Sequence, residues 1–172
     1  MSLRSIAKEA NVSQTAPYRH FKTKEDLLAE VSKKGFEKLG EILNQASGQN
    51  ENMTAKERFV EMGLAYVKFG LERRNTYDLM HSPIIDKVEF PELLEAASAA
   101  FDELIKIIAE LNPGISDTDL SRQCIRHWAQ VHGLVDLVGD TKIDESAGSN
   151  AGDAMSIVKK DLRSFLAMAL DS

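Results

Sequence analysis

Hydrophobic side chains recur at intervals of three and four residues along this chain, and no stretch alternates between apolar and polar residues as a strand would. Such spacing places the apolar side chains on one side of a helix. The pattern therefore predicts an all-α protein with eight helices, joined near the C-terminal end by a mobile loop over 139–152. The predicted helices span residues 3–9, 14–20, 24–46, 55–73, 76–82, 91–112, 117–138 and 153–170.

The ionisable residues are distributed unevenly along the chain. Residues 1–24 hold five Lys and Arg residues against one acidic residue, a formal charge of +4, whereas the whole chain of 172 residues carries −6. The remaining residues therefore carry −10. A basic N-terminal segment on an acidic body favours contact with phosphate groups through that segment alone.

The first two predicted helices are short and are joined by about four residues. Leu3 and Ala7 fall on one face of the first helix, and Ala16 is a small residue that can face it from the second. Asn11 can adopt a left-handed backbone conformation in the connection, and Val12 is expected to fill the gap between the helices. Two short crossed helices of this kind form a helix-turn-helix.

The outer side of the second helix carries side chains suited to a DNA duplex. Gln and Arg can form paired hydrogen bonds with base edges, whereas Ser, Thr, Tyr and Lys reach phosphate oxygens. Pro17 lies near the first turn, where a missing N–H is tolerated. The predicted DNA-contacting residues are Ser2, Arg4, Ser13, Gln14, Thr15, Tyr18, Arg19, His20, Lys22 and Lys24.

The run from Ser2 to Val31 resembles the DNA-binding segment of TetR-family repressors. The matching residues are Leu3, Ile6, Ala7, Val12, Ser13, Tyr18, His20, Phe21 and the run from Lys24 to Leu28. TetR-family heads carry a further helix ahead of the one that begins here at Leu3, so the resemblance implies a homeodomain-like head that is truncated at Met1. In the body, the segments 128–133 and 77–83 resemble a WHG-type TetR C-terminal domain.

The resemblance implies a ligand-responsive regulator, a repressor that leaves a palindromic DNA operator when a small molecule binds. It further implies a cytoplasmic homodimer whose effector is an apolar or amphipathic compound. The expected division places the helix-turn-helix and a linking helix in residues 1–47. Residues 48–172 then form the ligand-binding and dimerisation domain.

The body offers candidates for both of its expected functions. Met and aromatic side chains can line an adaptable apolar cavity. The predicted pocket residues are Met62, Tyr66, Phe69, Met80, His81, Phe101, Leu104, Ile108 and Trp128. The resemblance makes the apolar seams on the last two predicted helices a dimer interface, a four-helix bundle formed by two subunits; the alternative is ordinary packing within one chain. The predicted dimer residues are Cys124, Val131, Val135, Val138, Met155, Val158, Leu162 and Phe165.

Other functional classes find little support in the sequence. His127 and His132 are five positions apart and do not share a helix face, which disfavours zinc, and we expect no metal or cofactor. No phosphate-binding loop or nucleophile–base motif indicates an enzyme. No apolar run reaches the ~20 residues that span a bilayer, so no membrane partner is expected. The alternatives are a helical small-molecule-binding module without DNA-binding activity, and a small helical hydrolase or transferase.

Overall fold

The computed structural model describes residues 2–48, 52–139 and 149–170. Within these ranges the protein is all-α, as predicted, with no strand and two short 3-10 turns at Pro17–Arg19 and Lys87–Glu89. Most of the predicted loop over 139–152 lies outside the described residues. The α-helices are α1 (Leu3–Glu9), α2 (Lys24–Ser47), α3 (Ala55–Glu72), α4 (Arg74–Met80), α5 (Pro91–Leu111), α6 (Asp117–Gly139), α8 (Asn150–Lys160) and α9 (Leu162–Met168).

Side-chain caps fix the starts of the helices that matter most for the architecture. The Thr23 hydroxyl accepts a hydrogen bond from the Asp26 amide at 3.1 Å, and the Asp26 carboxylate accepts one from the Thr23 amide at 2.8 Å. Thr54 and Glu57 form the same reciprocal pair at the start of α3. Each box satisfies amide groups that the first helical turn leaves unpaired. The caps therefore place the starts of α2 and α3 where the sequence predicts them.

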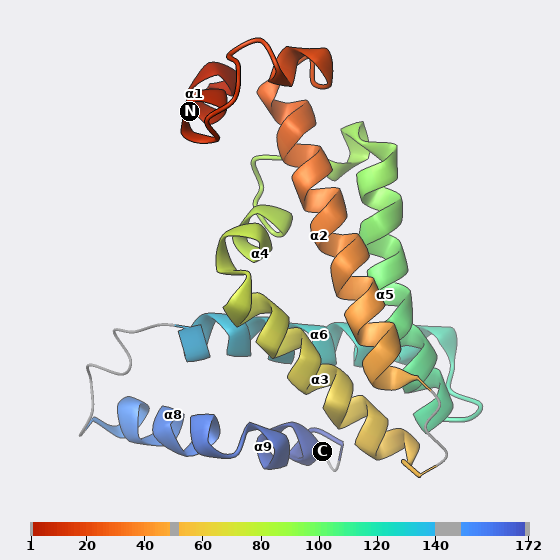
Figure 1. The fold of residues 1–172 in the computed structure, drawn as a ribbon. Coiled ribbons are helices and arrows are strands. Elements are labelled where there is room, and N and C mark those ends of the chain that lie inside the picture. The colour runs from red at the N-terminus through yellow and green to blue at the C-terminus, as the bar shows by residue number, and fades with distance from the viewer. Residues whose placement is uncertain (1, 49–51, 140–148, 171–172) are drawn as a thin grey trace.

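The body is a bundle in which α2 is a central element. Helix α2 runs alongside α5 and also packs on α3 and α4 (Figure 1). Its buried side chains include Phe36, Leu39 and Leu43, which belong to the main hydrophobic core. A Cβ atom at Gly35 would lie 2.5 Å from the Met80 sulfur, so the absence of a side chain at Gly35 lets Met80 of α4 pack closely on α2.

Helix α6 runs across the lower parts of α2 and α5 in the view of Figure 1 and packs on α3 and α5, and α9 packs against α3. A Cβ atom at Gly70 on α3 would lie 2.6 Å from a methyl group of Val135 on α6, so the two helices approach closely there. Leu166 of α9 is buried in the same core as Val135. The last described helix thus contributes to the fold of a single chain.

Two predicted helices differ from the structure. The prediction of an α-helix over 14–20 is wrong, because the only helical segment in this range is the 3-10 turn Pro17–Arg19. Pro17 has no amide hydrogen to continue the helical hydrogen-bond series, so its effect is larger than expected. The helix predicted over 153–170 is broken at Asp161, whose carboxylate accepts a hydrogen bond from the Ser164 amide at 3.0 Å and starts α9 anew.

Candidate nucleic-acid interface and internal cavity

The N-terminal head, defined here as residues 2–23, has a small interior of its own. Leu3 and Ala7 are buried on the inner face of α1. Asn11 adopts φ 53°, the left-handed conformation that the sequence predicts for the connection. Val12 is 50% exposed, so the prediction that it fills the gap between the helices is wrong. Phe21 closes the following turn, with its amide donating to the Pro17 carbonyl at 2.8 Å.

The outer surface of the head presents the residues predicted to contact DNA. Nine of the ten are exposed, and the tenth, Lys24, is half-buried at the start of α2. Tyr18 keeps half of its surface exposed although it is aromatic. The Ser13 and Thr15 hydroxyls lie 2.9 Å apart and hydrogen-bond to each other. The 3-10 turn therefore leaves Gln14, Tyr18 and Arg19 accessible even though no regular α-helix forms.

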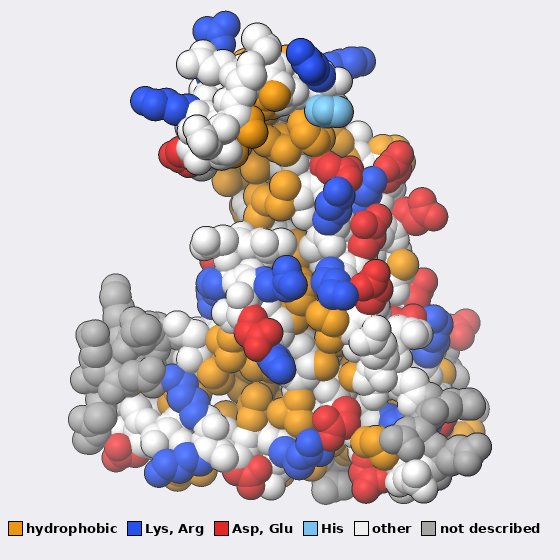
Figure 2. All heavy atoms as spheres, viewed as in Figure 1, with side chains coloured by type: hydrophobic (Ala, Val, Ile, Leu, Met, Phe, Trp, Pro, Cys, Tyr) orange, Lys and Arg blue, Asp and Glu red, His pale blue; other side chains and the backbone are white. Residues whose placement is uncertain are grey.

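The charge of the head differs from that of the body. Figure 2 shows Lys and Arg side chains projecting from the head, whereas acidic side chains are spread over the body below it. Arg4, Arg19 and Lys22 are all exposed. An anionic ligand such as a nucleic-acid backbone is therefore attracted to the head and repelled by the body.

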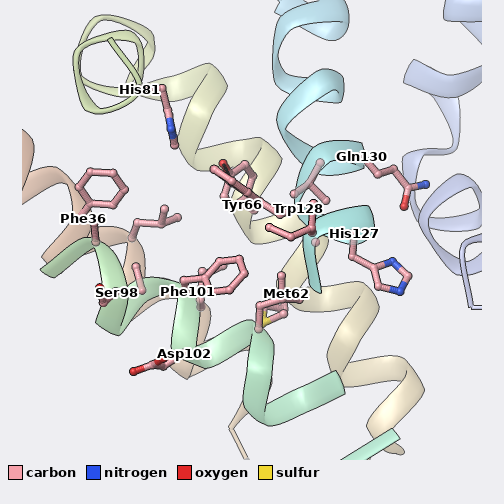
Figure 3. A pocket seen from close by; sticks show the side chains of 18 of the residues that line it. Phe36, Met62, Tyr66, His81, Ser98, Phe101, Asp102, His127, Trp128 and Gln130 are labelled. Atoms are coloured by element: carbon pink, nitrogen blue, oxygen red, sulfur yellow. Dashed lines mark hydrogen bonds between the residues drawn. The ribbon is translucent and has the colours of Figure 1, made fainter. Parts of the chain in front are cut away.

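An internal cavity of about 550 Å³ lies in the body. It is lined from α2, α3, α5, α6 and α9, with His81 at the C-terminal end of α4 and Lys87 in the second 3-10 turn, and its walls are mainly aromatic and aliphatic (Figure 3). That volume is within the range of small-molecule binding sites, ~300–1,000 Å³. The side chains that surround it include Phe36, Leu39, Leu43, Phe59, Met62, Tyr66, His81, Lys87, Phe101, Asp102, Leu104, His127, Trp128, Gln130, Val131 and Leu166.

The structure brings together most of the predicted pocket residues. Six of the nine line the cavity: Met62, Tyr66, His81, Phe101, Leu104 and Trp128. Phe69, Met80 and Ile108 do not, because they are buried in the solid core beside it.

The sequence analysis missed the side chains that α2 contributes to the cavity. Phe36, Leu39 and Leu43 follow the same three-and-four spacing as core residues. This spacing gave no signal that distinguishes a cavity wall from solid packing. Whether any lining residue binds a ligand stays a prediction.

A chain of hydrogen bonds begins at the cavity wall with Trp128 and Tyr66 and continues behind it to Tyr77 and His132. The Trp128 indole donates to the Tyr66 hydroxyl at 3.2 Å, and the Tyr66 and Tyr77 hydroxyls lie 3.1 Å apart. The Tyr77 hydroxyl also pairs with Nδ1 of His132. Burial raises the pKa of both tyrosines, so they remain neutral hydrogen-bonding groups. The chain links α3, α4 and α6 through polar contacts in an otherwise apolar interior.

His81 lies next to these hydrogen-bonded residues but takes no part in their hydrogen bonds. Its ring points into the cavity (Figure 3), and its buried Nε2 has no hydrogen-bond partner among the described residues. Its ring centroid lies 4.6 Å from that of His132. Burial is the main cause that lowers the pKa of His81 to about 4, and the nearby His132 is the second cause. His81 is therefore neutral near pH 7 and can donate or accept one further hydrogen bond.

Part of the predicted dimer surface requires correction. Cys124 and Val135 have no exposed surface within the single chain, so they form its core and leave nothing for a partner to contact. Val131 lines the cavity. The other five predicted residues are half-buried. They are Val138, Met155, Val158, Leu162 and Phe165.

The part of the chain that the structure describes contains neither a cluster of metal ligands nor a membrane-spanning helix. No group of three or more His, Cys, Asp or Glu side chains there could hold a metal ion. No helix in the same ranges is both long enough and apolar enough to cross a membrane.

A basic, exposed head of a short helix and a 3-10 turn, on a helical body with a cavity, is typical of DNA-binding regulators that carry reader and sensor in one chain. The model for bacterial regulatory proteins of the tetR family matches residues 1–31, and that for the tetracyclin repressor-like C-terminal domain matches residues 59–154. The chain therefore belongs to the TetR family of transcriptional regulators, which confirms the family prediction. The narrower WHG resemblance is not confirmed and stays a prediction.

The fold is also similar to a solved structure. A protein with unknown function from Rhodococcus sp. RHA1 is 29% identical to this chain, with a TM-score of 0.66. The alignment covers 97% of this chain and 85% of that one. No curated protein matches the sequence. The similarity thus supports the arrangement of head and body and leaves the ligand and the operator open.

Proposed function

We propose that this TetR-family regulator is a ligand-responsive repressor that a small molecule releases from a palindromic operator. One observation carries the proposal: α2 connects directly to the head through Thr23 and also supplies Phe36, Leu39 and Leu43 to the cavity wall. A ligand in the cavity therefore touches the same rigid element that positions the head. No catalytic step is part of this function.

The head is proposed to dock in the major groove through Gln14, Thr15, Tyr18 and Arg19. We propose that Arg4 and Lys22, together with Ser2, Ser13, His20 and Lys24, contact the phosphates on either side; all of them except Lys24 are exposed. Arg19 is the best candidate for reading a base, because a guanidinium can form two hydrogen bonds with guanine. Ligand binding that shifts α2 would change the position of this surface and weaken operator binding, a coupling typically of ~1–3 kcal/mol.

A palindromic operator requires two heads separated by about one DNA turn, ~34–36 Å, so the regulator is proposed to be a homodimer. Helices α6 and α8 are the candidate interface, since Leu137 and Ile157 are 47% and 70% exposed. The half-buried residues Val138, Met155 and Val158 lie on the same two helices. As a regulator of chromosomal DNA, the protein is proposed to act in the cytoplasm.

Gel-shift titration against DNA from upstream of the protein's own gene tests this function, with and without a panel of candidate effectors. We expect a shifted complex with a palindromic site, weakened by raised salt and released by at least one effector. Ligand binding without any salt-dependent DNA affinity would instead favour a small-molecule-binding module. Failure to bind any palindrome in that region would contradict the repressor function.

A further inference from the structure

The cavity wall is not uniform: His81 and Lys87 lie near the ring of Phe36, whereas the polar residues Asp102, His127 and Gln130 line other parts of it. The His81 and Phe36 ring centroids are 5.7 Å apart, and the Lys87 ammonium lies 5.9 Å from the centroid of the same ring. Away from Phe36, the lining includes the apolar side chains of Phe59, Met62 and other residues on α2, α3, α5 and α6. The cavity therefore has a cationic group, Lys87, beside Phe36 and a mainly apolar wall elsewhere.

Lys87 differs from other cationic side chains in the body that are at least partly buried. Lys33, Arg58 and Arg74 each form at least one ion pair with a carboxylate. Lys87 is half-buried and forms no ion pair among the described residues. An aromatic face supplies part of the stabilisation that an anion would give, but it does not neutralise the charge. The position is therefore suited to an anionic group that comes from elsewhere.

His81 adds the hydrogen bond that such a group would need. Its buried Nε2 lacks a partner, and the neutral ring can place its one N–H on that nitrogen. Lys87 and His81 are both half-buried, so a carboxylate between them keeps part of its hydration. This lowers the desolvation cost that a fully buried ion would meet.

We propose, building on the ligand-binding function above, that the effector is an amphipathic monocarboxylate. Its apolar part fills the space between Phe59, Met62 and Phe101, and its carboxylate pairs with Lys87 and accepts a hydrogen bond from His81. The other charged lining residue is Asp102, which is exposed on α5. Because Asp102 is exposed, it offers no buried carboxylate with which a cationic ligand could pair.

Three probes that share the same alkyl chain and differ only in the polar head group test the proposed ligand class: decanoate, 1-decanol and decylammonium. Trp128 is the only tryptophan of the sequence and lines the cavity, so its emission reports occupancy without any need for DNA. We expect affinity to fall in the order decanoate, 1-decanol, decylammonium. A charge-assisted hydrogen bond is about twice as strong as a neutral one, which favours the carboxylate.

Lys87→Met removes the charge and keeps the side-chain length. The substitution should lower the affinity for decanoate by about tenfold and change the affinity for 1-decanol by less than about twofold, as expected for the loss of one charge-assisted contact. Lys68→Met is the matched control, because Lys68 is exposed on α3 and does not line the cavity. His81→Leu is a second variant, and it should also lower the affinity for decanoate more than the affinity for 1-decanol.

The outcomes separate this proposal from the broader one. Equal or tighter binding of 1-decanol, or an unchanged decanoate affinity in Lys87→Met, would overturn the monocarboxylate class while leaving a working apolar cavity. If none of the three probes changes the emission of Trp128, the cavity itself is not a ligand site and the proposed effector response also fails. Circular dichroism spectra that match the parent protein verify that each variant is folded.

Discussion

The head and the body of this regulator are built with very different amounts of interior. Within the head, only Leu3 and Ala7 are buried among the described residues, and neither belongs to the main hydrophobic core. The body buries side chains from α2, α3, α4, α5, α6 and α9 in one continuous cluster. The comparison indicates that the body holds most of the stability and that the head depends on α2 for its position.

The same difference separates the two functions. On the head, polar side chains face outward and almost nothing shields them from solvent. In the body, the polar groups of Tyr66, Tyr77 and Trp128 are held by one another at the cavity wall and behind it. A surface for phosphates and bases needs exposed donors, whereas an apolar ligand needs a dry, shaped space.

The largest effect on stability is expected in the core of the body. Phe69 is 3% exposed on α3 and does not line the cavity. Phe69→Ala should lower the free energy of unfolding by about 3–5 kcal/mol, because it removes buried apolar surface and leaves a void. Urea denaturation followed by circular dichroism measures the loss. A loss below about 1 kcal/mol would show that α3 is not part of a tightly packed core.

Leu3→Ala is the matched change in the head. Leu3 is nearly as buried as Phe69, but it belongs to a separate, smaller interior. We expect the main unfolding transition to change by less than about 1 kcal/mol, because the head opens locally without unfolding the body. Operator affinity should fall nonetheless. An equal loss in both variants would mean that head and body unfold as one unit.

The buried histidine of the body predicts a dependence of stability on pH. The pKa of His81 is lowered from 6.5 to about 4 by burial and by His132, so the fold favours the neutral ring. This contribution is present above pH ~6.5 and is lost as the pH falls toward 4. Because the ring is partly exposed, the difference should be on the order of 1–2 kcal/mol.

Unfolding free energies of the parent protein and of His81→Leu, measured at pH 7 and pH 4.5, isolate this contribution. The variant should lose less stability than the parent between the two pH values. His20→Gln provides the control, because His20 is exposed on the head. An identical pH dependence in the parent and in His81→Leu would contradict the assignment to His81.

A smaller effect is expected where the two regions join. Thr23→Ala removes the hydroxyl that accepts from the Asp26 amide, at a cost of about 0.5–2 kcal/mol. The loss should be local to the first turn of α2, since the rest of that helix packs in the body. Amide hydrogen exchange should therefore accelerate near Asp26 and remain unchanged near Leu39. Faster exchange along all of α2 would show that the cap stabilises the whole helix.

The sequence predicted the bounds of the long helices well, because their caps and apolar spacing are local signals. It did not predict that Pro17 reduces the second helix to a 3-10 turn, or that Asp161 divides the last helix. At Asp161 a side-chain hydrogen bond to the Ser164 amide competes with the helical backbone bonds, whereas Pro17 lacks the amide hydrogen that a regular helix would need. The cavity was predicted only in part, since Phe36 and Phe69 have the same spacing pattern and differ only in what packs against them.

Operator affinity in two arginine variants tests the central claim, that the outer face of the head reads DNA. Arg19 is exposed on the head, and Arg122 is exposed on α6 and paired with Asp119. Fluorescence anisotropy with an operator duplex should show that Arg19→Ala weakens binding by at least about tenfold with an unchanged melting temperature. Arg122→Ala should bind as the parent does. Equal affinities for the parent and Arg19→Ala would contradict the claim.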